Sequence, residues 1–145
     1  MPRTNPAPAS HFYAAHTDNP DDSAPVDADG IQQTVAVALA PLPPGAHLVP
    51  EALQTTARLL TGHAQLLLPL AEAKNRARRP APRGPGLVGY GLAHVRHQLE
   101  KVPCPDPEAE AEAALVWVQE MARHCRMLLG LALADDRERR HAAAW

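Results

Sequence analysis

Apolar residues recur every three or four positions along most of this chain, in segments that clusters of proline separate. The longest segment, 50–78, carries one such row: Leu53, Ala57, Leu60, Ala64, Leu67 and Ala71. This spacing puts side chains on one face of an α-helix, whereas a half-buried strand would alternate apolar and polar residues. Proline lacks the backbone N–H that a helix interior needs, so the proline clusters mark helix ends. The pattern therefore predicts several amphipathic helices that bury their apolar faces against one another.

The pattern divides into four helical segments, at about 29–40, 50–78, 87–102 and 107–134. Asp27 or Asp29 can cap the first segment, and Pro50 suits the first position of the second. The last segment has the clearest start, because Asp106 can cap it and Pro107 can take its first position. Short links between amphipathic helices predict an antiparallel up-down bundle, but the pattern does not specify which helices are neighbours.

Two features modify the second and third segments. Pro69 lies inside the second, nearly opposite the apolar row, so we expect a kink on the wetted side and no break. The third carries a narrow apolar row: Val88, Leu92, Val95, Leu99 and Val102. Gly91 lies beside this row, where it would permit close approach of another backbone.

Composition supports an all-α fold. Hydrophobic residues make up 46% of the chain, and much of this is Ala, while aromatic residues make up only 3%. Leu, Val and Ala pack readily between helices, whereas sheets draw on Ile, Thr, Tyr and Phe, which are scarce here. We expect a disordered N-terminal segment (1–26), a helical bundle domain (27–134) and a charged flexible tail (135–145).

Charge and cysteine content limit the classes of function. The net charge is −2, so nothing global draws the chain to nucleic acid. No apolar run approaches the ~18 residues of a membrane span, and the N-terminus lacks the apolar core of a secretion signal. Two cysteines do not make a disulfide framework, so we expect a reducing cytoplasm.

His63 is the polar residue that stands out within an apolar face. It falls among Leu59, Leu66 and Leu67 on the second segment, with Thr56 on the same face. A buried imidazole needs a hydrogen-bond partner. His63 is therefore either a core histidine bonded to a hydroxyl or a backbone carbonyl, or a ligand-binding group inside the bundle with Thr56 beside it.

A basic run crosses the end of the second segment and the loop after it: Lys74, Arg76, Arg78, Arg79 and Arg83. Cations are favourable near a helix C-terminus, and the run could also pair with the acidic start of the last helix. As a nucleic-acid patch it lacks interleaved aromatic residues and a recognition helix. Nucleic-acid binding through this run is thus an alternative function and not the first expectation.

The spacings assemble no catalytic set, metal site or cofactor site. His94 and His97 lie one turn apart, and His124 precedes Cys125. The first two point away from the apolar row of their helix, whereas Cys125 points into its own, so one metal would have to reach both sides. Residues 84–89 match the glycine pattern of dinucleotide sites, but the proline-rich sequence before them excludes the required strand. We predict no catalytic residue, no metal and no cofactor.

The stretch from Ala57 to Pro69 resembles the central motif of an uncharacterised family of short actinomycete proteins, and its most specific part is Gly62-His63-Ala64-Gln65-Leu66-Leu67-Leu68-Pro69. Members are commonly labelled natural-product biosynthesis proteins. The resemblance extends from about Ile31 to Leu129 and implies a helical bundle in a bacterial cytoplasm. It implies no particular activity.

These observations predict a non-catalytic accessory or protein-interaction helical protein, linked through the resemblance to natural-product biosynthesis. We expect a protein partner or a homodimer, and no membrane. The alternatives are a small regulator that contacts nucleic acid through its basic loop and a ligand-binding bundle that uses His63.

Overall fold

The computed structural model describes residues 26–78 and 86–134. The predictions for residues 1–25, for Arg79 and Arg83, and for residues 135–145 lie outside this part of the chain. The described residues form helices α2 (Ala28–Leu39), α3 (Pro50–Arg78), α4 (Gly86–Lys101) and α5 (Ala111–Leu133), and they contain no strand. The predicted all-α bundle is confirmed.

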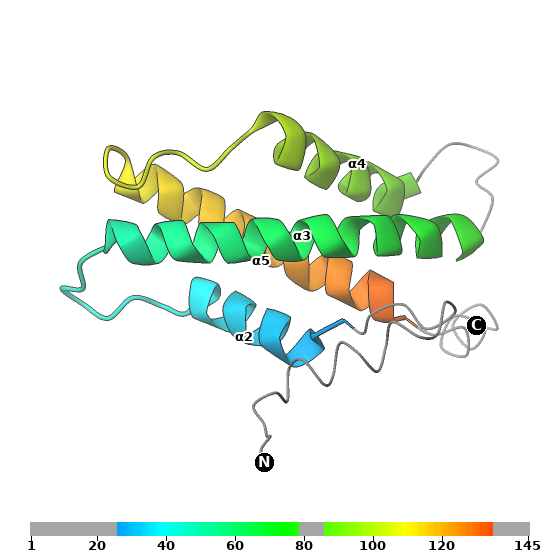
Figure 1. Ribbon diagram of the computed structural model, residues 1–145, viewed down its shortest axis with the longest axis horizontal. Coiled ribbons are helices and arrows are strands. Elements are labelled where there is room, and N and C mark those ends of the chain that lie inside the picture. The colour runs from blue at the N-terminus through cyan, green and yellow to red at the C-terminus, as the bar shows by residue number, and fades with distance from the viewer. Residues whose placement is uncertain (1–25, 79–85, 135–145) are drawn as a thin grey trace, which may run out of the picture.

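Helices α3 and α5 make the most extensive contact, and they run in the same direction (Figure 1). Helix α2 packs against both α5 and α3, and α4 packs against α3 on the other side. Consecutive helices run in opposite directions, so the central pair is parallel because α4 lies between α3 and α5 in the chain. This arrangement shows which helices are neighbours, which the sequence pattern does not specify.

The start of α2 is fixed by Asp27, one of the two predicted caps. Its Oδ1 accepts a hydrogen bond of 3.0 Å from the backbone N–H of Gly30. This bond satisfies one of the N–H groups that the first turn of a helix leaves without an acceptor. Asp29 lies within the first turn, where its charge faces the positive end of the helix.

Helix α3 has the predicted bounds and continues through Pro69. Pro69 is exposed, as predicted from its position opposite the buried row. It offers no N–H to the carbonyl of Gln65, which is also exposed, so water can solvate that carbonyl.

Helix α5 begins later than predicted. Asp106 does cap a turn, since its Oδ1 accepts from the N–H of Glu108 at 2.9 Å and its carbonyl accepts from the N–H of Glu110 at 2.7 Å. That turn is separate from the helix, because Glu110 has an extended φ of −138°. The helix therefore starts at Ala111, with Glu110 as its N-cap residue.

Helix α4 lies one residue earlier than predicted and buries a different set of side chains. Leu92 and Val95 are buried as expected, but Val102 lies beyond the helix and is 42% exposed. The third buried residue of the helix is Gln98, which is 3% exposed. Among the described residues, no backbone approaches Gly91 closely: a Cβ built there would make ordinary van der Waals contact, at 3.7 Å, with the sulfur of Met127 on α5.

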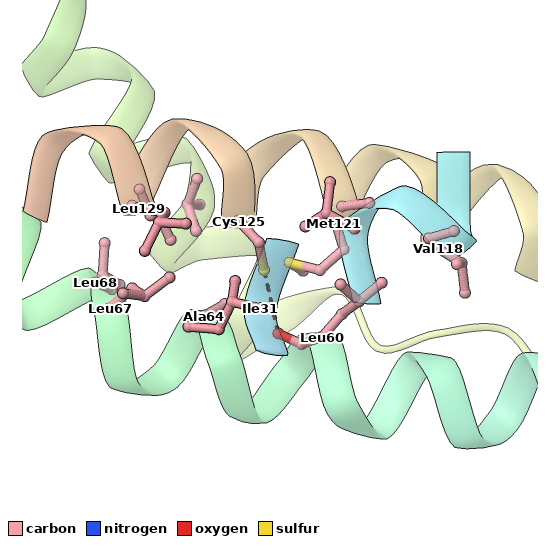
Figure 2. Close-up of a cluster of buried hydrophobic side chains, with 14 of the residues drawn as sticks. Ile31, Leu60, Ala64, Leu67, Leu68, Val118, Met121, Cys125 and Leu129 are labelled. Atoms are coloured by element: carbon pink, nitrogen blue, oxygen red, sulfur yellow. Dashed lines mark hydrogen bonds between the residues drawn. The ribbon is translucent and has the colours of Figure 1, made fainter. Parts of the chain in front are cut away.

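The core lies mainly between α3 and α5, with Ile31 of α2 inserted against both (Figure 2). Leu60, Met121 and Cys125 are each 0% exposed. The Cys125 thiol donates a hydrogen bond of 3.4 Å to the carbonyl of Leu60, which ties the two central helices together. Burial raises the pKa of this thiol to about 12, so Cys125 is a protonated core residue.

Candidate functional site

His63 lies at the edge of the contact between α2 and α3. Its Nε2 is 3.3 Å from Oγ1 of Thr34 on α2. The Thr34 hydroxyl donates its proton to the carbonyl of Gly30, at 3.0 Å, so it accepts from His63. Burial lowers the pKa of His63 more than the nearby Asp27 carboxylate raises it, which favours the neutral ring.

The surroundings of His63 differ from the prediction. Leu59 and Leu66 are 47% and 49% exposed and are not part of the buried face. Thr56 is half-buried on α3, but the hydroxyl that contacts His63 belongs to Thr34. The sequence offered one signal for Thr34, which follows the buried Ile31 by three positions and so flanks the apolar face of α2.

Lys74 differs in its surroundings from Arg76 and Arg78, the two other described residues of the basic run. The Lys74 ammonium donates a hydrogen bond of 2.8 Å to the carbonyl of Ala134, at the C-terminal end of α5. A cation is favourable there because the last carbonyls of a helix are electron-rich. Arg76 and Arg78 are exposed. The acidic start of α5 lies at the opposite end of the molecule from the C-terminal end of α3, so Lys74, Arg76 and Arg78 do not pair with it (Figure 1).

A groove of about 740 Å³ lies between α3, the end of α4 and the loop 102–107. Its α3 wall carries a polar row at positions i, i+4, i+7 and i+11: Gln54, Arg58, Thr61 and Gln65. These spacings bring the row to one side of the helix, toward α4 and away from the central α5 contact.

The opposite wall is the proline-rich loop, which α5 holds in place. The indole N–H of Trp117 donates a hydrogen bond of 2.9 Å to the carbonyl of Val102. Pro107, at the far end of the loop, is buried. Pro103, Pro105 and Pro107 fix the backbone further because each ring restricts φ. The groove is therefore bounded by two walls of restricted conformation.

Cys104 lines this groove without the properties of a nucleophile. Its side chain is half-buried, and burial raises the pKa of its thiol. A reactive cysteine needs a lowered thiol pKa, because the thiolate is the attacking species. Cys104 thus contributes a weakly polar surface to the groove.

A second polar cluster joins α4 to α5. The amide N–H₂ of Gln98 donates to Oε1 of Glu120 at 3.1 Å, and the Gln98 Oε1 accepts from Nε2 of His124 at 2.9 Å. The neutral His124 ring then carries its lone pair on Nδ1. Nε2 of His94 lies 3.8 Å from Oε2 of Glu120, and the rings of His94 and His124 meet edge to face at 5.3 Å between centroids.

The electrostatics of this cluster favour a neutral His124. Burial, first, and the neighbouring His94 and Arg123 lower its pKa, while the Glu120 carboxylate opposes them. Sequence reasoning missed the grouping because it paired His94 with the exposed His97, and His124 with the inward-facing Cys125. A signal was present in the i, i+4 spacing of His94 with Gln98 and of Glu120 with His124.

The fold and groove define a small all-α protein whose groove lies between the polar row of a long helix and a proline-rich loop. The chain belongs to the Family of unknown function (DUF6415), whose family model matches residues 29–137. This match covers most of α2 and the whole of α3, α4 and α5. No curated protein and no solved structure matches the chain. None of the described helices is long and apolar enough to cross a membrane.

Proposed function

We propose that the protein is a non-catalytic interaction module that holds an extended segment of a partner protein in the groove between α3 and the loop 102–107. The polar row of Gln54, Arg58, Thr61 and Gln65 carries this proposal. The row offers side-chain donors and acceptors to a partner backbone, while the apolar rings of the loop face it. Such a surface suits recognition of an extended chain by main-chain hydrogen bonds and side-chain contacts.

The dimensions of the row favour an extended segment over a compact ligand. At 1.5 Å per residue, the eleven steps from Gln54 to Gln65 cover about 16 Å. An extended chain rises about 3.3 Å per residue, so the row matches roughly five residues of a partner. Arg58 lies in the middle of the row and offers a charged fork to a carbonyl or carboxylate of that segment.

The α3 wall of the groove also overlaps the stretch that carries the family resemblance, and Gly62 and Gln65 belong to its most specific part, Gly62 to Pro69. Arg58, Thr61, Gly62 and Gln65 all lie within the stretch 57–69 and all line the groove. The same stretch also supplies core residues, since Ala57, Leu60, Ala64, Leu67 and Leu68 are buried. Its groove-lining residues support a binding role for this side of α3.

The setting of this interaction follows from the resemblance alone. We place the protein in a bacterial cytoplasm, as an accessory to natural-product biosynthesis. The partner is then an enzyme or regulator of such a pathway. Deletion of the gene in a producing strain should alter the yield of a natural product, and unchanged metabolite profiles would contradict this setting.

Blocking the groove tests the proposal directly. In the Gly62→Trp variant an indole enters the groove, and the position tolerates it because a Cβ there meets no atom within 4 Å. Gly130→Trp is the matched control, since Gly130 is a helical glycine on α5 with equally open surroundings. The tagged full chain and the Gly130→Trp variant should recover the same partner from the source organism. The Gly62→Trp variant should lose it.

A photo-crosslinking residue at position 65 gives a second readout. We expect it to attach to the partner within a short segment, whereas the same residue at position 130 should not attach. Equal recovery of a partner by both tryptophan variants would exclude the groove as the binding site. Failure of the native chain to recover any partner would contradict the proposal as a whole.

A homodimer is the second candidate, favoured by the outer face of α3. This face carries Leu59 and Leu66, which lie one heptad apart and are each about half exposed. Dimerisation through this face predicts that Leu59→Glu yields a monomer in sedimentation analysis. A native chain that sediments as a monomer at all concentrations would exclude it.

A further inference from the structure

The helices α4 and α5 bring together three side chains of metal-binding type that lie far apart in the sequence. One imidazole nitrogen of His94, one carboxylate oxygen of Glu120 and one imidazole nitrogen of His124 all lie within 4.8 Å of one another. His94 is exposed, while Glu120 and His124 are half-buried. The group therefore opens to solvent on one side and rests on the bundle on the other.

Gln98 holds this group in position. It is buried and contacts Glu120 with its N–H₂ group and His124 with its carbonyl oxygen. A hydrogen bond from the second nitrogen of an imidazole to a carbonyl is the usual way in which proteins orient a metal-binding histidine. Gln98 serves this purpose for His124 and steadies the Glu120 carboxylate with the same amide group.

We propose that His94, Glu120 and His124 form a binding site for a divalent transition metal of the zinc class, on the surface between α4 and α5. Two imidazoles and one carboxylate are ligands that Zn²⁺ accepts, with water in the remaining position. Around a tetrahedral ion with bonds of about 2.0–2.1 Å, neighbouring ligand atoms lie about 3.3 Å apart. The 3.8 Å between His94 Nε2 and Glu120 Oε2 needs only small side-chain rotations to reach this value.

Mixed nitrogen and oxygen donors also define which ions fit. Ca²⁺ and Mg²⁺ prefer sites made only of oxygen, so the two imidazoles disfavour them. Zn²⁺, Co²⁺ and Ni²⁺ all accept imidazole and carboxylate together. Mg²⁺ therefore serves as the ion that should not bind.

Competition for zinc between the full chain and a chromophoric chelator measures the affinity of the site for zinc. We expect the native chain to bind one equivalent that His94→Ala and His124→Ala each weaken by at least tenfold. His97→Ala is the matched control, because His97 is exposed on the same helix one turn away from His94. This variant should bind zinc within twofold of the native chain. An equal loss in His97→Ala, or native affinity retained in the His94→Ala/His124→Ala double variant, would overturn the proposal.

Two further readouts separate coordination from a merely structural role of these residues. Co²⁺ bound to the native chain should give the intense visible bands of a tetrahedral site, and Glu120→Gln should reduce them. Zinc should raise the thermal unfolding midpoint of the native chain and leave that of His94→Ala unchanged, because binding to the folded state stabilises it. His94 is exposed, so its removal leaves the fold intact. Absence of the visible bands, or an equal thermal shift in His94→Ala, would contradict coordination.

Discussion

At the scale of single residues, hydrogen-bond partners account for His63 and Lys74, two of the polar groups that the sequence pattern singles out. His63 bonds to Thr34 across the α2–α3 contact, and Lys74 donates to the carbonyl of Ala134, which caps the C-terminal end of α5. Periodicity predicts that such groups lie near an apolar face, but it cannot name a partner on another helix. The burial of Gln98 was not predicted. Gln98 lies outside the apolar row of its helix, and glutamine is mostly exposed in proteins.

The lowered pKa of His63 makes stability depend on pH. A base whose pKa is lower in the folded state binds fewer protons there than in the unfolded state. Its contribution to stability is therefore complete above the ordinary pKa of about 6.5. That contribution is lost as pH falls through 6.5 toward the folded value. We predict that the loss of unfolding free energy between pH 7.5 and pH 5 is smaller in His63→Leu than in the native chain, measured by urea unfolding.

The control for this prediction is His47→Leu, since His47 is an exposed loop residue. This variant should retain the native pH dependence. The pKa of His124 is also lowered, so part of the pH dependence of stability should remain in both variants. Identical pH profiles for His63→Leu and the native chain would show that the imidazole is as solvated in the folded state as in the unfolded chain.

Two glycines should respond to alanine with opposite signs. Gly62 lies inside α3, where a Cβ meets no atom within 4 Å, so Gly62→Ala should raise the unfolding free energy by about 0.5–1 kcal/mol. Gly86 has φ of +73°, a conformation that alanine rarely adopts, so Gly86→Ala should lower it. Chemical denaturation measures both. A stability loss in Gly62→Ala would mean that another part of the chain covers that position.

At the scale of elements, the sequence predicted the helices well where local signals determine their ends. The bounds of α3 were predicted because Pro50 starts a long apolar row that no internal Gly-Pro cluster interrupts. The start of α5 was predicted wrongly. Asp106 and Pro107 form a good start signal, but it starts only a single turn, which Glu110 separates from the helix. Local capping rules identify a turn, and only the tertiary setting decides whether the helix continues from it.

The cap of α2 gives an element-scale prediction. Asp27→Ala removes the acceptor of the Gly30 N–H and should lower the unfolding free energy by about 1 kcal/mol. Asp29→Ala removes only a favourable charge in the first turn and should cost about 0.3–0.5 kcal/mol. Thermal or urea unfolding of both variants makes the comparison. A larger loss of unfolding free energy in Asp29→Ala than in Asp27→Ala would show that Asp27 is not the residue that caps α2.

At the scale of the whole molecule, the parallel pair of α3 and α5 organises both the core and the groove. The apolar row predicted for α3 contains all the buried residues of that helix except Leu68, since burial follows the 3.6-residue period. Sequence reasoning could not predict the groove or the His94–Glu120–His124 group. Both depend on which helices are neighbours, and many arrangements satisfy the same apolar pattern.

Two adjacent leucines test the position of the core. Leu60 is 0% exposed and faces α5, so Leu60→Ala should lower the unfolding free energy by about 2–5 kcal/mol. Leu59 is 47% exposed on the outer face, so Leu59→Ala should cost less than about 1 kcal/mol. Equal losses, measured by urea unfolding, would place the outer face of α3 in an interface.

The direction of α5 relative to α3 is tested most directly by pulsed electron paramagnetic resonance between spin labels. In a Cys104→Ser/Cys125→Ala background, one sample carries labels at Arg78→Cys and Leu133→Cys, and a second at Glu51→Cys and Leu133→Cys. Because α3 is about 40 Å long at 1.5 Å per residue, the parallel pair predicts a distance shorter in the first sample by on the order of 20 Å. A shorter distance in the second sample would mean that α5 runs antiparallel to α3, and the core and groove described for this protein would not exist.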